Sequence, residues 1–192
     1  MKKLLITGFD PFDGNSKNPA WEAVKLLPEK IGEYEVCKIE IPTIFGKAAE
    51  TVIEKALEVE PDLILCIGQA GGRAAVTPER IAVNIRDAKI PDNAGNLPTD
   101  TFVAKEGPAA YFSTVPVKSM ADAICSADIP GAVSNSAGAF VCNDTLYLLL
   151  RHYEGTPVKV GFIHVPYLPE QGSPSLPLAD TVRALTAAIE VC

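Results

Sequence analysis

A cysteine in the surroundings expected of a nucleophile lies in the segment Ser134–Leu150. A predicted strand ends at Ser134, a loop of small residues follows, and Cys142 falls in the opening turn of an amphipathic helix. A helix N-terminus carries partial positive charge and unpaired N–H groups, which can stabilise a thiolate or an oxyanion. Cys142 is therefore a candidate nucleophile, although the same segment also fits a buried structural thiol.

His164 is the candidate base for this cysteine. It ends the apolar strand pattern Val158–Ile163 and is followed by Val165 and Pro166. Ligands of open α/β sheets bind outside the carboxyl ends of the strands, so a base at this position can meet a nucleophile. The other histidine, His152, lies late in a predicted helix, where a role at the helix C-terminus or in solvent is expected.

Three further segments contain candidate residues. Glu79 begins a predicted strand and could orient a histidine as the third member of a triad, or could be a surface charge. The glycine-rich turn Gly68–Arg73 could cradle phosphate, but its spacing matches neither a Walker loop nor the dinucleotide fingerprint. The loop Gly8–Gly14 holds two phenylalanines, which form either a lid on the core or one wall of an apolar pocket.

The elements that must position these residues alternate between short apolar runs and amphipathic stripes. The predicted strands are Lys3–Thr7, Glu35–Ile41, Asp62–Ile67, Arg80–Ile85, Gly131–Ser134 and Val158–His164. The predicted helices are Asn18–Leu27, Ala49–Leu57, Val117–Ile124, Phe140–Tyr153 and Leu178–Val191. Several strands are continuously apolar, as expected where helices cover both faces of a sheet. The pattern predicts an α/β fold, a three-layer α/β/α sandwich with a mixed, largely parallel central sheet.

Composition limits the classes of function. The 192 residues, 47% of them hydrophobic and 21% charged, fit one globular domain, 1–192. A formal charge of -7 repels nucleic acid and anionic lipid. No apolar run approaches the ~20 residues of a membrane span, and the N-terminal apolar stretch is too short for a secretory signal. We therefore expect a cytoplasmic protein with neither a nucleic-acid nor a membrane partner.

The cysteines and histidines argue against a disulfide framework and a metal cluster. The five cysteines are odd in number and form no CxxC pair, which favours reduced thiols. Only two histidines are present, so a cysteine–histidine zinc site is disfavoured. We expect no metal site.

Taken together, the segments resemble the motif series of the pyroglutamyl peptidase I family, also called pyrrolidone-carboxylate peptidases. The matching segments span nearly the whole chain in order: GFDPFDG, NPAWEAV, IPTIFGK, CIGQAGGR, TPERIAVN, IPDNAGN, GPAAYF, SNSAGAFVCN and FIHVPYLPEQ. The resemblance implies a cysteine peptidase that removes N-terminal pyroglutamyl residues from peptides and needs no cofactor. It also implies an α/β/α sandwich and a cytosolic homo-oligomer, a dimer or tetramer.

By motif position, the resemblance makes Cys142 the nucleophile, His164 the general base and Glu79 the acidic member of a triad. It places the substrate pocket among Phe9, Phe12, Asn18, Thr43, Ile90, Phe140 and Val141. Lys89 joins this set where many members of the family have arginine close to the reacting centre. Ala139 is a second departure, because many members have threonine there.

The residues suit the implied substrate, and two other classes of function stay open. Pyroglutamate is a neutral lactam without an α-ammonium group, so its pocket should be apolar and lack a carboxylate that binds amines. An α/β enzyme that binds phosphate or a nucleoside through the turn Gly68–Arg73 is one alternative. An inactive family member that serves as a binding or assembly protein is the other, suggested by the departures at Lys89 and Ala139.

Overall fold

A six-stranded sheet runs through the middle of the molecule, in a computed structural model that describes residues 1–192. In spatial order its strands are β2 (Lys30–Ile31), β3 (Tyr34–Ile41), β1 (Lys2–Phe9), β4 (Leu63–Gln69), β8 (Lys159–Val165) and β5 (Thr77–Pro78). The four central strands β3, β1, β4 and β8 are parallel, and the short edge strands β2 and β5 are antiparallel to their neighbours. The predicted mixed, largely parallel sheet is confirmed.

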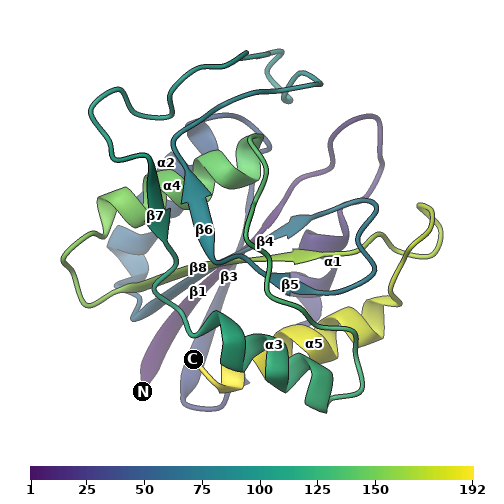
Figure 1. Cartoon of the computed structure of the whole chain (residues 1–192). Coiled ribbons are helices and arrows are strands. Elements are labelled where there is room, and N and C mark those ends of the chain that lie inside the picture. Colours follow the sequence, from purple (N-terminus) through teal and green to yellow (C-terminus); the bar gives the residue numbers. More distant parts are fainter.

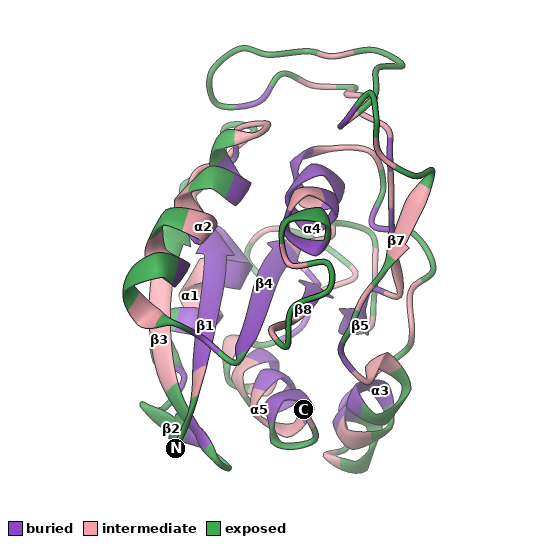
Figure 2. Ribbon diagram, turned by 90° about the vertical axis from the view of Figure 1, so that its left-hand side faces the viewer, coloured by how far each residue is buried: buried purple, intermediate pink, exposed green.

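Helices cover both faces of this sheet (Figure 1). One face carries α1 (Pro19–Leu26), α3 (Val117–Ser126) and α5 (Leu178–Glu190), and the other carries α2 (Lys47–Val59) and α4 (Val141–His152). Strands β1, β4 and β8 are buried along almost their whole length, as Figure 2 shows in purple, because both of their faces meet a helical layer. The three-layer sandwich expected from the sequence is therefore confirmed. None of the five helices combines the length and apolar composition needed to cross a membrane.

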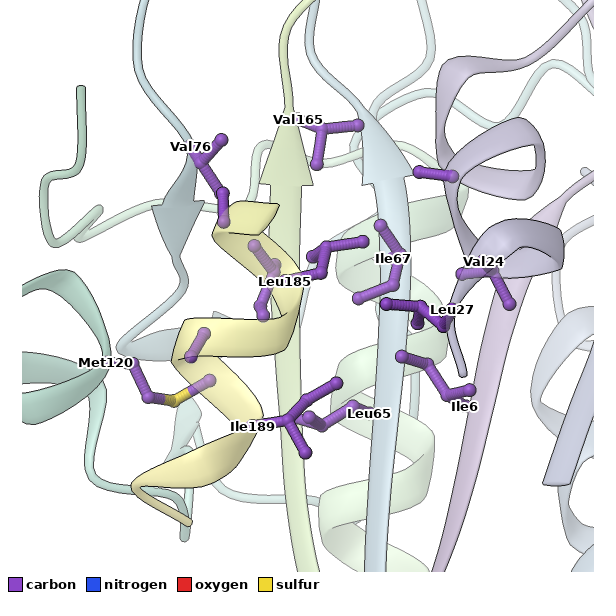
Figure 3. Close-up of a cluster of buried hydrophobic side chains, with 14 of the residues drawn as sticks. Ile6, Val24, Leu27, Leu65, Ile67, Val76, Met120, Val165, Leu185 and Ile189 are labelled. Carbon is purple, nitrogen blue, oxygen red and sulfur yellow. The ribbon is translucent and has the colours of Figure 1, made fainter. Parts of the chain in front are cut away.

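Side chains of one strand serve both layers because successive residues point to opposite faces. On β4, Leu65 and Ile67 pack in the cluster beneath α1, α3 and α5, and this cluster includes Leu185 and Ile189 of α5 (Figure 3). The intervening Cys66 of β4 belongs to the second cluster, beneath α2 and α4. The continuously apolar strands thus support two cores at once.

The sheet edge next to β8 departs from the expected strands. The predicted strand Arg80–Ile85 is shorter and does not join the main sheet: β6 (Ile81–Val83) pairs with β7 (Ala110–Phe112) in a separate ribbon against α4, and the edge position beside β8 is taken by β5, which was not predicted. The predicted strand Gly131–Ser134 makes only isolated bridges. Proline has no N–H to donate, so Pro78 limits the length of a ladder at this edge.

The strands β1, β4 and β8 end at the same edge of the sheet, where α4 begins (Figure 1). In the ladders, His164 of β8 lies between Gly68 of β4 and Thr77 of β5. The topology therefore brings the loops after β1 and β4, the histidine and the start of α4 to one place.

Candidate active site

A cavity of about 260 Å³ lies at the carboxyl edge of the sheet. The predicted site residues that line it are Phe9, Phe12, Asn18, Thr43, Phe140, Cys142 and His164. It is completed by Gln69, Ala70, Gly71 and Arg73, from the turn that was considered for phosphate binding, and by Ala137 and Gly138, which were assigned to no site. A larger groove, about 610 Å³, runs between α2 and α4, but none of the predicted residues lines it.

Cys142 is the second residue of α4, and the two residues after it anchor the start of this helix. The buried side chain of Asn143 pairs with the backbone of Val83 in β6, accepting from its N–H and donating to its C=O, each at 2.9 Å. The carboxylate of Asp144 is fully buried and accepts a hydrogen bond from Arg86 Nε at 2.6 Å. These contacts fix the helix start and therefore fix the direction of the thiol.

His164 and Glu79 form a buried pair behind the cavity. The distance from His164 Nδ1 to Glu79 Oε1 is 2.7 Å, and the Glu79 side chain is fully buried. Burial by itself would raise the pKa of Glu79, but its interactions with His164, together with hydrogen bonds from Ser134 and Arg73, outweigh burial, so that the pKa of Glu79 is lowered. An ionised carboxylate only accepts hydrogen bonds, so Nδ1 must be the donor. The neutral imidazole then has Nε2 as its acceptor, the tautomer that a general base requires.

Arg73 was considered only as the end of a possible phosphate-binding turn, and its contact with Glu79 was not predicted. Its Nη1 donates to Glu79 Oε1 at 2.6 Å and to Thr77 Oγ1 at 2.7 Å. Arginine and glutamate are only six residues apart, and a buried carboxylate needs a cationic or hydrogen-bonding partner, so this signal was present in the sequence. Because the guanidinium is occupied by a carboxylate, the arrangement disfavours the interpretation of the turn Gly68–Arg73 as a phosphate cradle.

The surroundings of the Cys142 thiol favour its protonated form, against the preference of a helix N-terminus for a thiolate. Burial raises the pKa of Cys142 to about 12, and the charge of Glu79 raises it further, while Arg73 lowers it. Burial also lowers the pKa of His164. The resting pair is thus a neutral thiol and a neutral imidazole in one cavity, so a base must remove the thiol proton during attack.

Aromatic rings build one wall of the cavity. Phe12 and Phe140 have ring centroids 6.2 Å apart. Behind them, the ring of Phe45 meets Phe140 edge-on at 5.3 Å and lies 5.7 Å from the guanidinium carbon of Arg86. Phe45 was not predicted, because it reaches the site only through the contact between the loops before α2 and α4.

Two polar side chains of the cavity wall, Asn18 and Thr43, form hydrogen bonds with the protein backbone. Asn18 caps α1 by accepting from Ala20 N–H at 3.0 Å and donates to the carbonyl oxygen of Asp10 at 3.0 Å. Thr43 Oγ1 donates to the same carbonyl oxygen at 3.3 Å. No aspartate or glutamate lines the cavity. The cavity therefore presents an apolar wall without an acidic group.

The remaining predicted residues lie outside the cavity wall. Lys89 is exposed and Ile90 is half-buried, and neither lines the cavity. Val141, the first residue of α4, is fully buried in the core beneath α2 and α4. The loop that contains Lys89 is folded around Asp92, which accepts from the backbone N–H of Phe45 at 3.0 Å. No group of three or more His, Cys, Asp or Glu side chains is arranged to hold a metal ion.

Known proteins match this chain over nearly its whole length. The family model described as "Pyroglutamyl peptidase" matches residues 2–192. A pyrrolidone-carboxylate peptidase of Levilactobacillus brevis is 54% identical, over 97% of this chain and 95% of the relative. The crystal structure of pyroglutamyl peptidase I from Bacillus amyloliquefaciens superimposes with a TM-score of 0.96 at 43% identity, covering 100% of this chain and 96% of the other. The pyrrolidone carboxyl peptidase from Thermococcus litoralis gives a TM-score of 0.94 at 38% identity, with coverages of 100% and 93%.

The close packing around Gly68 offers a test of the site geometry. A Cβ on Gly68 would lie 2.7 Å from Cζ of Phe162 and 3.0 Å from Sγ of Cys142, so Gly68→Ala must displace one of them. We expect a loss of about 1–3 kcal/mol in the free energy of unfolding. We also expect a roughly tenfold slower alkylation of Cys142, because displacements of about 1 Å at a reacting group are costly. Peptide mass spectrometry after timed exposure to iodoacetamide measures the alkylation.

Gly161→Ala is the matched control for this substitution. Gly161 is also a sheet glycine, and its Cβ would lie 2.5 Å from Cγ2 of Val115, in the core away from the thiol. This variant should lose stability but keep the parent rate of Cys142 alkylation in its folded fraction. Equal alkylation rates in the two variants would contradict the close packing of Gly68 against the thiol.

Proposed function

The chain belongs to the pyroglutamyl peptidase family, and on that premise we propose that it removes N-terminal pyroglutamyl residues from peptides through a Cys142–His164–Glu79 triad. One observation carries the proposal: the thiol and the imidazole line the same aromatic-walled cavity, and His164 Nδ1 lies 2.7 Å from the buried Glu79 carboxylate. This arrangement supplies a nucleophile, a base in the required tautomer and a group that orients the base.

The proposed reaction begins with transfer of the Cys142 proton to Nε2 of His164. The sulfur attacks the carbonyl carbon that joins the pyroglutamyl residue to the next residue, and forms a tetrahedral intermediate. As the C–N bond breaks, His164 gives the proton to the leaving amine and a thioester remains on Cys142. Water, deprotonated by His164, then attacks the thioester carbonyl. The C–S bond breaks, pyroglutamate leaves, and His164 returns the proton to the sulfur of Cys142. Glu79 stabilises the imidazolium in both steps, since its carboxylate accepts the Nδ1–H hydrogen bond.

The start of α4 supplies the proposed oxyanion site. The first backbone N–H groups of a helix have no intrahelical partner, and no side chain caps this helix. Cys142 lies in that first turn, so these N–H groups lie beside the attacking sulfur and can stabilise the oxyanion. Lys89 is exposed and does not line the cavity, so we assign it no part in this stabilisation.

Substrate selection is proposed to follow from shape and the absence of an acid. Phe12 and Phe140 fit the apolar edge of a lactam ring, and Phe9 extends the same wall. A free α-ammonium group finds no carboxylate in the cavity wall. The wall instead contains the guanidinium of Arg73, which is always positively charged and repels an ammonium group. Peptides with a free N-terminal amine should therefore bind poorly.

We further propose that residues 1–192 act as one peptidase domain, in the cytoplasm and as a homo-oligomer. The chain covers 95% of the length of the Levilactobacillus brevis relative, which supports a single unit. Large exposed apolar side chains at Leu97, Phe102 and Phe112 support an interface between copies, since such residues are costly in contact with water. A solution mass equal to one chain, measured by light scattering, would contradict the oligomer.

Substitution of the thiol and the imidazole tests the assignment of roles. Cys142→Ser and His164→Ala should each lower kcat for a pyroglutamyl amide at least ~1000-fold, because the nucleophile and its base act as one unit. Cys125→Ser and His152→Ala are the matched controls, since both of these residues are exposed. Fluorophore release measures turnover, and the midpoint of thermal unfolding verifies folding. A folded Cys142→Ser variant with parental turnover would exclude Cys142 as nucleophile.

A substrate comparison tests the proposed selectivity. The parent protein should cleave a pyroglutamyl amide with kcat/KM at least ~100-fold above that of the matching glutamyl and prolyl amides, because each carries an α-ammonium group that the cavity leaves unpaired. Phe12→Ala should reduce this ratio by removing part of the apolar wall. Comparable turnover of the three amides by the parent would contradict a pocket built for the lactam.

A further inference from the structure

Arg73 is the charged side chain nearest to the proposed triad that has no role in the reaction described above. It follows the glycine-rich turn after β4, and 31% of its side chain is exposed while the Glu79 carboxylate that it contacts is fully buried. Its Nη1 lies 2.6 Å from Glu79 Oε1, and its Nη2 donates to the carbonyl oxygen of Ser136 at 3.0 Å. The guanidinium thus bridges the carboxylate and the loop before α4, at the wall of the cavity.

We propose that Arg73 is a positioning residue that sets the pH at which His164 can act as a base, by holding the carboxylate oxygen that His164 also uses. The proposal rests on the proposed triad. It assigns Arg73 no contact with the reacting atoms, so it is not a catalytic residue in the strict sense.

Sharing of one oxygen is the geometric basis of the proposal. Glu79 Oε1 lies 2.7 Å from His164 Nδ1 and 2.6 Å from Arg73 Nη1. The imidazole and the guanidinium therefore share one negatively charged acceptor. Thr77 reinforces the arrangement, because its hydroxyl accepts from Arg73 Nη1 at 2.7 Å while its backbone pairs with His164 in the β5–β8 ladder. A carboxylate fixed in this way presents its oxygen to the ring from one direction.

The charges around the ring define the sign of the effect. His164 faces one carboxylate, Glu79 from the segment between β5 and β6, and one guanidinium, Arg73 from the loop after β4. The thiols of Cys142 in α4 and Cys66 in β4 complete the titratable groups of the site, and both are neutral because burial raises their pKa to about 12. Burial lowers the pKa of His164, Glu79 opposes that shift, and the positive charge of Arg73 adds to it.

Loss of the guanidinium charge therefore favours the imidazolium. With Glu79 as the only charged neighbour, His164 should take up its proton at higher pH, and a protonated ring cannot accept the proton of Cys142. The acidic limb of the dependence of kcat/KM on pH should move toward neutral pH. A purely structural arginine, which only closes the turn onto Ser136, would lower activity by the same factor at every pH.

The direct test is the titration of His164 in the full-length protein, with and without the charge at position 73. The chain has only two histidines, so ring signals in a nuclear magnetic resonance spectrum give two titration curves, and the exposed His152 is an internal control. Arg73→Gln keeps hydrogen-bond donors but removes the charge, and it should move the His164 midpoint upward by about one pH unit. Arg73→Lys keeps the charge and should move it much less. The His152 midpoint should stay unchanged in both variants.

Kinetics provide the second readout, with a matched surface arginine as control. Arg73→Gln should lose several-fold more kcat/KM for a pyroglutamyl amide at pH 6 than at pH 8, because a larger fraction of its His164 is protonated at pH 6, and tenfold is the upper limit for a shift of about one pH unit. Arg183→Gln should match the parent at both pH values, although Arg183 also bridges a carboxylate, Asp180 at 2.9 Å, and a carbonyl oxygen, that of Ala127 at 2.7 Å.

Each outcome decides the proposal. An unchanged His164 midpoint in Arg73→Gln, or an equal upward shift in Arg73→Lys, would overturn it. If Arg73→Gln fails to fold, Arg73→Met supplies the uncharged variant and the same criterion applies. The titration needs no substrate, so it stands even if the parent cleaves no pyroglutamyl amide, which would instead overturn the proposed function.

Discussion

The buried hydrogen bond between Glu79 and His164 is the interaction on which the site depends. A carboxylate with no solvent contact is costly unless it is paired, and here two cationic or polar side chains reach one of its oxygens. The pair forms only because β5 runs antiparallel beside β8 and places Thr77, and with it Glu79, against His164. A two-residue edge strand therefore governs both the orientation of the imidazole and its resting charge.

The second constraint is the placement of α4 relative to this sheet. Asn143 and Asp144 tie the helix start to β6 and to Arg86, so the thiol is fixed by residues that do not themselves face the cavity. The space for the thiol exists because Gly68 leaves out a side chain beside it. Nucleophile and base thus come from different layers, and their meeting depends on packing between layers. Reactivity follows from that packing, since burial keeps the thiol and the imidazole neutral.

Much of this arrangement is readable from the sequence, and the part that is not has a common cause. Periodicity predicted the helices and the four central strands, and local signals singled out Cys142 and His164, because these features depend on neighbours in the chain. Phe45 was missed, since it reaches the site through a contact between loops that no local pattern encodes. The contact between Arg73 and Glu79 was missed although the two residues are close in sequence, because the burial of Glu79 depends on the edge of the sheet. A helix N-terminus favours a thiolate, but burial raises the pKa of Cys142 to about 12, and that burial depends on packing between layers rather than on neighbours in the chain. Lys89, implied by resemblance, is exposed and lines no part of the cavity.

The central claim is that Cys142 carries the acyl group during turnover, and trapping that intermediate tests it most directly. A pyroglutamyl ester has a good leaving group, so acylation should outpace hydrolysis of the thioester and the intermediate should accumulate. Acid quenching within the first turnovers, followed by intact and peptide mass spectrometry, should find one pyroglutamyl group on Cys142. A burst of released alcohol with no adduct on Cys142, or an adduct on another side chain, would contradict the account.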